Sequence, residues 1–199
     1  MHAQLGWPWA VAVIFLFLGL GCAPGAAGVP EHERQALVDF YIFTNGFSSW
    51  VNDIGWGTEA PVCTWFGVLC DDNATAVFGL RLSSNGLQGS LPAQICQLSA
   101  LEDLQLYDNK LTGTVPACIG NLTKLIRLYL DTNELTGEIP AQICQLSALT
   151  ELQLSDNRLT GMVPACVGHL TKLITLYLDT NELTGEIPAQ ICQLSALKD

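Results

Sequence analysis

Positive charge and histidine are scarce in this 199-residue sequence. It has 8 Lys and Arg against 19 Asp and Glu, a formal net charge of −11 at pH 7, and 3 His. Phosphate binding needs clustered positive charge, so the composition argues against a nucleic acid or an anionic membrane surface as partner. The sequence also shows no Ser/His/Asp arrangement, metal-ligand spacing or phosphate loop. We therefore expect no enzyme activity, no cofactor and no metal site.

The chain has no charged side chain before Glu31 other than the titratable His2. An apolar run over residues 7–20 is followed by small residues over 21–28, which predicts a secretory signal peptide at 1–27. An uncleaved signal anchor is the alternative, because the uncharged stretch is nearly long enough to span a bilayer. The sequons at Asn73 and Asn121 fit the secretory route as glycosylation sites.

From Leu80 onward the sequence repeats every 24 residues, five times. Each repeat reads L-x-L-x-x-N-x-L-x-G-x-(I/L/V)-P-x-x-(I/V)-x-x-L-x-x-L-x-x, with bounds 80–103, 104–127, 128–151, 152–175 and 176–199. Such a period predicts a solenoid, in which each repeat forms one coil stacked on the next. The alternating Leu pair that opens each repeat predicts a short strand, and stacked coils then make a parallel sheet. We expect the Asn to bond backbone groups of neighbouring coils, the Gly to allow a tight bend, and the Pro to start the outer side.

Coils two and four resemble each other, as do coils three and five, so the duplicated unit is 48 residues. The last coil ends with no change of pattern, which would leave its apolar side chains open to water. We expect from this that the array is truncated.

Residues 28–79 lack the repeat and are expected to form a cap over the first coil. Residues 31–43 (EHERQALVDFYIF) have the apolar spacing of a short amphipathic helix, at Ala36, Leu37, Phe40 and Tyr41. Cys63 and Cys70 are expected to form a disulfide, since free thiols are uncommon in secreted proteins and no zinc-ligand partners lie nearby. The expected lid is an aromatic-rich loop that contains Phe47, Trp50, Trp56, Trp65 and Phe66.

Five more cysteines lie in the repeats, and two interpretations remain open for them. They are small, mostly buried residues of the outer side, or they form the disulfides Cys96–Cys118 and Cys144–Cys166 and leave Cys192 over. The mature chain has an odd number of cysteines, so at least one is unpaired in either case.

The segment Cys63-Thr-Trp-Phe-Gly-Val-Leu-Cys70 resembles the N-terminal cap signature C-x-W-x-G-V-x-C of plant-type leucine-rich repeat proteins. The L-x-G-x-I-P core at residues 135–140 resembles the 24-residue plant class of the repeat. The resemblance covers the chain after the signal peptide. It implies a right-handed superhelix of α/β type, with a short parallel β-sheet on the concave face and a 3-10 or irregular convex side. It also implies a protein that is secreted, or exposed on the outer face of the plasma membrane or in the cell wall, as in receptor-like ectodomains and polygalacturonase-inhibitor-like proteins.

The polar positions of the predicted strands form columns that face solvent, where exposed Tyr among Asp and Gln is typical of a recognition surface. We expect this face to bind a protein, peptide or glycan. A secreted inhibitor of cell-wall-degrading enzymes and a structural or adhesive wall protein are the two alternatives. The candidate ligand-binding residues are Arg81, Tyr107, Arg127, Tyr129, Asp131, Gln153, Asp156, Tyr177 and Asp179.

Overall fold

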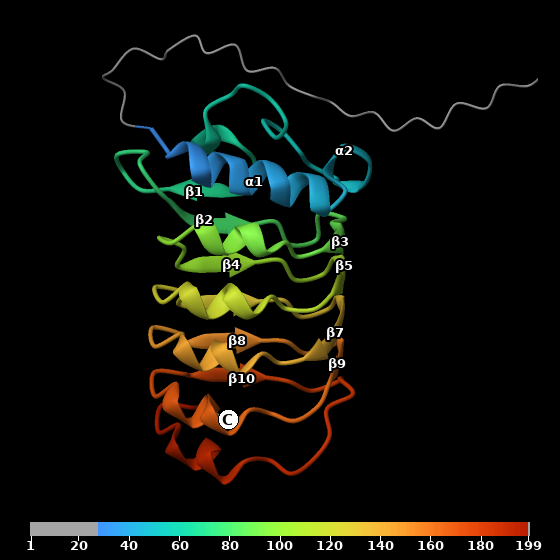
Figure 1. The fold of residues 1–199 in the computed structure, drawn as a ribbon, viewed down its shortest axis with the longest axis vertical. Helices are drawn as coiled ribbons and strands as arrows, with labels where there is room; N and C mark the ends of the chain where they lie inside the picture. Colours follow the sequence, from blue (N-terminus) through green and yellow to red (C-terminus); the bar gives the residue numbers. More distant parts are fainter. Residues whose placement is uncertain (1–27, 199) are drawn as a thin grey trace, which may run out of the picture.

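The computed structural model describes residues 28–198, so the predicted signal peptide at 1–27 lies outside the described residues. Five coils stack along one axis, and the helix α1 (Glu31–Phe43) lies across the first of them (Figure 1). No helix within residues 28–198 has the length and apolarity that crossing a bilayer requires.

One face of the stack is a six-stranded sheet, here called the long sheet. Its order is β1-β2-β4-β6-β8-β10, and the five strands of the repeats are parallel and pair one repeat apart. Leu80 thus lies beside Leu104, and Leu104 beside Leu128. The predicted strand of each coil is confirmed at the first leucine of the pair, and it ends before the second. The repeat strands are β2 (Val77–Arg81), β4 (Asp103–Gln105), β6 (Arg127–Tyr129), β8 (Glu151–Gln153) and β10 (Thr175–Tyr177).

A second sheet runs along the side of the stack, which the sequence analysis did not anticipate. Gly113 does bend the chain, at φ 75°, but the residues before it pair with the neighbouring coil. The Lys110 amide donates to the Leu87 carbonyl oxygen at 2.8 Å, and Thr112 lies in register with Ser90. The strands, in the order β3-β5-β7-β9, are β3 (Gln88–Ser90), β5 (Lys110–Gly113), β7 (Glu134–Glu138) and β9 (Arg158–Thr160).

The outer side of each coil is a five-residue 3-10 helix that begins directly after the repeat proline. Proline lacks the amide hydrogen and fixes φ, so it suits the extended position before a helical turn. The predicted 3-10 outer side is confirmed. These helices are η2 (Ala93–Gln97), η3 (Ala117–Asn121), η4 (Ala141–Gln145), η5 (Ala165–His169) and η6 (Ala189–Gln193).

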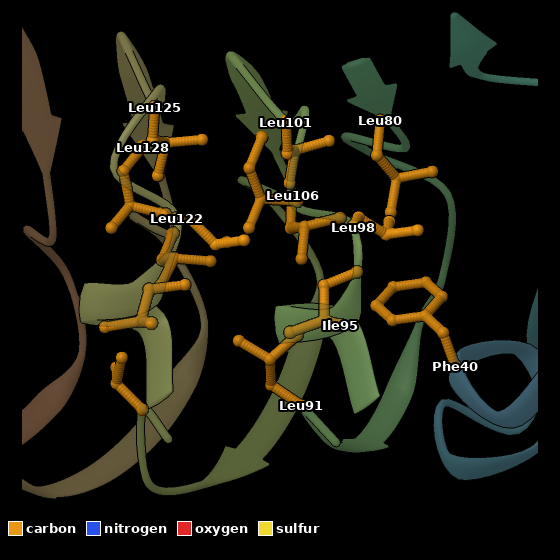
Figure 2. Close-up of a cluster of buried hydrophobic side chains, with 14 of the residues drawn as sticks. Phe40, Leu80, Leu91, Ile95, Leu98, Leu101, Leu106, Leu122, Leu125 and Leu128 are labelled. Carbon is orange, nitrogen blue, oxygen red and sulfur yellow. The ribbon is translucent and has the colours of Figure 1, made fainter. Parts of the chain in front are cut away.

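The core is a continuous stack of aliphatic side chains between the two sides of the coils. All seven aliphatic positions are buried in each of the first three coils. Figure 2 shows the Phe40 ring closing this stack at the cap end, beside Ile95 and Leu98. In the last coil Leu176 is only partly buried and Ile187 is 78% exposed, because no further coil covers them in this structure.

The repeat asparagines form the predicted ladder between coils. The Asn133 amide donates to the carbonyl oxygens of Leu106, one coil back, and Leu130, and its Oδ1 accepts from the Leu111 amide at 3.0 Å. Asn85 makes the corresponding contacts with the cap, since its side chain exchanges two hydrogen bonds with the Asn52 backbone. The ladder therefore ties each coil to its predecessor and the first coil to the cap.

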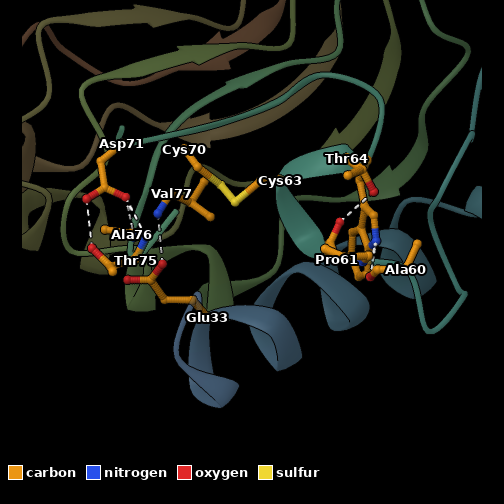
Figure 3. Close-up of a disulfide and its surroundings, with 11 residues drawn as sticks. Glu33, Ala60, Pro61, Cys63, Thr64, Cys70, Asp71, Thr75, Ala76 and Val77 are labelled. Carbon is orange, nitrogen blue, oxygen red and sulfur yellow. Dashed lines mark hydrogen bonds between the residues drawn. A yellow bond between two sulfur atoms is a disulfide. The ribbon is translucent and has the colours of Figure 1, made fainter. Parts of the chain in front are cut away.

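The predicted cap helix is α1, and its predicted apolar positions are buried. The helix also buries Glu33, which the sequence analysis did not single out: its carboxylate accepts from the Val77 amide at 2.9 Å, at the start of β2 (Figure 3). The remaining cap elements are α2 (Gly46–Ser49), η1 (Val62–Thr64) and β1 (Val68–Cys70), which pairs antiparallel with β2.

The aromatic lid is smaller than expected. Trp56 and Trp65 are buried, with ring centroids 5.0 Å apart, and Trp50 packs against Trp56. Phe47 lies at the edge of the lid, 73% exposed with its ring centroid 4.7 Å from that of Tyr41, and Phe66 is also exposed, so both are less covered than expected. Tyr41 of α1 fills the space beside Trp50 instead.

Disulfides join both the cap and the repeats. The Cys63–Cys70 disulfide joins η1 to the end of β1 (Figure 3). In the repeats the structure forms the pairs Cys96–Cys118 and Cys144–Cys166, with Cα atoms 5.9 and 5.8 Å apart, and leaves Cys192 free and exposed. The second of the two sequence interpretations is thus the one observed, and the repeat cysteines are not simple buried residues.

Candidate recognition surface

The exposed face of the long sheet carries two columns of side chains. The strand column follows the first Leu of each repeat, and the turn column follows the second. Hydrogen bonds in the parallel pattern continue past the strands, as from the Leu106 amide to the Tyr129 carbonyl oxygen at 2.9 Å, so both columns stay in register. The strand column is Arg81, Gln105, Tyr129, Gln153 and Tyr177, and the turn column is Ser83, Tyr107, Asp131, Ser155 and Asp179.

Next to the turn column lies a third column in which every residue has a left-handed backbone. The five φ angles lie between 51° and 54°, and none of the residues is glycine. Thr132 and Thr180 are β-branched, for which this conformation is strained. Backbone pairing holds them in place, with the Thr132 amide 3.0 Å from the Ser155 carbonyl oxygen. This left-handed column is Ser84, Asp108, Thr132, Asp156 and Thr180, and the sequence pattern did not reveal its backbone conformation.

An ionic network occupies the cap-side half of the sheet face. Asp103 is only 2% exposed and lies between two arginines: its Oδ2 is 2.7 Å from Arg81 Nη2 and 3.8 Å from Arg127 Nη1. Arg127 also contacts Glu151, with Nε 3.3 Å from Oε1. The candidate residues Arg81 and Arg127 are therefore neutralised within the protein, and Asp103 is buried between them.

Tyr129 belongs to this network as well. Its hydroxyl donates to the Glu151 carboxylate, and its ring centroid is 6.4 Å from that of Tyr107. Burial, followed by the hydrogen bond and negative charge of Glu151, raises the pKa of Tyr129, so its hydroxyl stays protonated. Tyr129 is partly buried, and it presents less free surface than the sequence suggested.

The free aromatic surface lies at Tyr107 and Tyr177, which are 38% and 52% exposed. Gln153 of the strand column lies in register between Tyr129 and Tyr177. Asp131 faces the same surface, and burial, reinforced by the charges of Asp156 and Asp108, raises its pKa. The structure thus brings the nine candidate residues onto one sheet face. Arg81, Arg127 and Tyr129 bond to Asp103 or Glu151 and form its paired half. The other six candidates take no part in this network and form the unpaired half.

The predicted glycosylation sites lie away from this face. Asn73 is exposed in the turn between β1 and β2, and Asn121 is exposed at the end of η3 on the outer side. A glycan at either position would leave the sheet face open. Among residues 28–198, no group of three or more His, Cys, Asp or Glu is arranged to hold a metal ion.

Family models and related proteins agree with this geometry. Two models described as leucine rich repeat match the chain, one over residues 139–199 and one over 100–122 and 124–146. The ectodomain of BIR2 from Arabidopsis thaliana has a TM-score of 0.70 and 30% identity, over 82% of this chain and 86% of that one. The chain belongs to the leucine-rich repeat family. Its fold is that of the plant receptor-like ectodomains.

Two other relatives of this leucine-rich repeat chain are longer proteins. Receptor-like protein 3 of A. thaliana is 40% identical over 106 residues, which are 53% of this chain and 14% of that protein. The ectodomain of the receptor kinase GASSHO1/SCHENGEN3 of A. thaliana, solved in complex with CASPARIAN STRIP INTEGRITY FACTOR 2, has a TM-score of 0.73 and 32% identity. That match covers 83% of this chain and 20% of the receptor ectodomain. The chain thus spans a small part of the length of these relatives.

Proposed function

We propose that this leucine-rich repeat chain is an extracellular, non-catalytic recognition module that binds a peptide or protein on the exposed face of the long sheet. The observation that carries the proposal is the display of two exposed tyrosines, Tyr107 in the turn column and Tyr177 in the strand column, on one sheet face among carboxylates without ion pairs. Tyrosine supplies a large contact area with only two side-chain torsions to immobilise, which favours it at binding hot spots.

The construction of the face supports this role. The repeat strands β2 to β8 are held on both sides by neighbouring strands, and β10 is held on one side by β8, so little backbone order is lost when a partner binds. The GASSHO1/SCHENGEN3 ectodomain, which shares this fold, was solved with the factor named in its complex. By analogy with such receptor-like relatives, we place the protein outside the cell, either secreted or on the plasma membrane.

The test uses selection from a random peptide library on the purified protein, followed by affinity measurements on variants. Selected peptides should bind the Tyr107→Ala/Tyr177→Ala double variant about tenfold or more weakly, since exposed hot-spot tyrosines contribute roughly 1–2 kcal/mol each. Both side chains are exposed, so the thermal unfolding midpoint should stay nearly unchanged.

Met162→Ala is the matched control, because Met162 is 67% exposed but lies beyond β9, off the long sheet. It should leave peptide affinity unchanged. Peptides that bind the double tyrosine variant as well as the native protein would overturn the proposed surface. Selective binding of oligosaccharides in place of peptides would assign the same face to glycans.

A further inference from the structure

The unpaired half of the sheet face has one carboxylate per coil. From coil two to coil five these carboxylates alternate between the left-handed column and the turn column. The alternation follows from the 48-residue unit, in which even coils read Asp-Asn and odd coils read Asp-Thr-Asn at this point. The four residues are Asp108, Asp131, Asp156 and Asp179.

No cation of the described chain, residues 28–198, forms an ion pair with any of the four. Arg81 and Arg127 are both taken up by Asp103 and Glu151, and Arg158 pairs with Glu134 on the second sheet. Asp131 Oδ1 is buried and has no hydrogen-bond partner. The face therefore has an uncompensated negative potential that is complementary to a cationic partner.

The spacing of the face selects the conformation of that partner. Like residues recur on every second coil: Asp131 and Asp179 are two coils apart, as are Asp108 and Asp156. Neighbouring strands are ~4.8 Å apart, so the recurrence is ~9.6 Å along the stack. A polyproline II helix returns to the same face every three residues, after ~9.3 Å, whereas a β-strand does so every two residues, after ~6.7 Å. Only the polyproline II period of ~9.3 Å stays close to the ~9.6 Å recurrence of the carboxylates over several coils.

Aromatic rings complete the match. Tyr129 and Tyr177 also recur two coils apart, and the exposed Tyr107 has its ring centroid 6.4 Å from that of Tyr129. Tyrosine side chains are the surfaces on which polyproline II ligands pack in aromatic-lined grooves. The negative charge of the face, its ~9.6 Å recurrence and its tyrosine rings therefore all favour the same class of ligand.

We propose that the long-sheet face binds a proline-rich, cationic peptide segment that lies along the stack in a polyproline II conformation, with Lys or Arg at every third residue. This proposal rests on the function proposed above and specifies its ligand. Each basic side chain would form an ion pair with a carboxylate of one pair of coils, and the next basic side chain with the equivalent carboxylate of the next pair. The prolines would contact Tyr107 and Tyr177.

The experiment compares four synthetic peptides by fluorescence anisotropy on the native protein. They are four copies of Pro-Pro-Lys, the same composition with the lysines grouped at one end, four copies of Gly-Gly-Lys, and four copies of Pro-Pro-Glu. The spaced Pro-Pro-Lys peptide should bind about tenfold more tightly than the grouped and glycine peptides, and the Glu peptide should not bind. Its affinity should fall as salt rises, since the contacted charges are near the surface.

Protein variants locate the site. Asp131→Asn/Asp179→Asn should weaken the spaced peptide about tenfold, as the loss of two ion pairs at a sheet face predicts. Glu138→Gln/Glu186→Gln removes the same charge from exposed positions off the long sheet and should leave affinity within about twofold.

Equal binding of the spaced and grouped peptides would overturn the proposal, because it would mean attraction by net charge alone. Unchanged affinity in the Asp131→Asn/Asp179→Asn variant would overturn it by placing the peptide elsewhere. Library peptides that depend on Tyr107 and Tyr177 but are neither basic nor proline-rich would overturn this inference and leave the proposed recognition function standing.

Discussion

The outer side of the solenoid joins its coils in two different ways that use the same pair of positions. The residue after the outer Ile or Val of one coil always meets the residue before the outer Ile or Val of the next. Between coils one and two, and between three and four, these residues are cysteines and form a disulfide. Between coils two and three they are Gly120 and Gln142, and a Cβ on Gly120 would lie 2.4 Å from the Gln142 carbonyl oxygen.

The comparison shows that one stacking geometry admits two kinds of junction. In the disulfide junction a covalent bond fills the space between neighbouring 3-10 helices. In the glycine junction the missing side chain lets backbone approach backbone, and Gly168 repeats this against Gln190 at 2.3 Å. The 48-residue sequence unit is the length over which the two junctions alternate. Duplication of that unit copies both junctions together, so the disulfide and glycine junctions continue to alternate along the array.

The largest expected effect comes from removing one disulfide. Cys96→Ala/Cys118→Ala should lower the free energy of unfolding by about 3 kcal/mol, because the bond closes a loop of roughly 22 residues in the unfolded chain. Denaturant unfolding followed by circular dichroism measures the change. The matched control is Cys192→Ala, which removes a free and exposed thiol and should leave the midpoint unchanged. Equal midpoints for the two variants would mean that the disulfide junction contributes nothing beyond packing.

A smaller loss is expected at the other junction. Gly120→Ala should cost about 2 kcal/mol, since the added methyl group meets a backbone oxygen that moves only if coils two and three separate. Gly28→Ala is the control, because nothing lies within 4 Å of a Cβ at that position. Thermal unfolding of both variants gives the difference. A neutral Gly120→Ala would show that this junction is loosely packed and that glycine is not required there.

These junctions mark the boundary of what the sequence alone could predict. The long-sheet strands, the asparagine ladder and the cap helix follow from local patterns: alternating leucines, an invariant polar position and a helical spacing in residues 31–43. Each of those patterns lies within one coil or within the cap, so it can be read without knowing which residues face each other across coils. The pairing of Cys96 with Cys118 depends on which residues face each other across two coils, and the sequence left it as one of two interpretations.

The second sheet and the ionic network were missed for related physical reasons. Strands such as β3, Gln88–Ser90, are too short to show an alternating pattern, and a glycine lies in or directly after each one. Asp103 has the sequence position of a solvent-facing residue, but Arg81 and Arg127 from the flanking strands β2 and β6 close over it. Charge pairing across coils therefore decided which candidate residues stayed free to bind a partner, and the repeat pattern of one coil does not contain that information.

The smallest expected effect is a conversion of one junction into the other. Gly120→Cys/Gln142→Cys places cysteines at the positions that form disulfides one coil earlier and one coil later. We expect the bond to form, because the same positions are brought together, and mass measurement after alkylation of free thiols detects it. The gain in unfolding free energy should be about 1 kcal/mol, below that of a native disulfide, since coils two and three must separate slightly to admit two side chains. The reduced form of the same variant is the control and should be less stable than the native protein, as the Gly120→Ala result predicts. A gain as large as that of the native disulfides would show that the two junctions have the same spacing and that glycine there reflects only the copied unit.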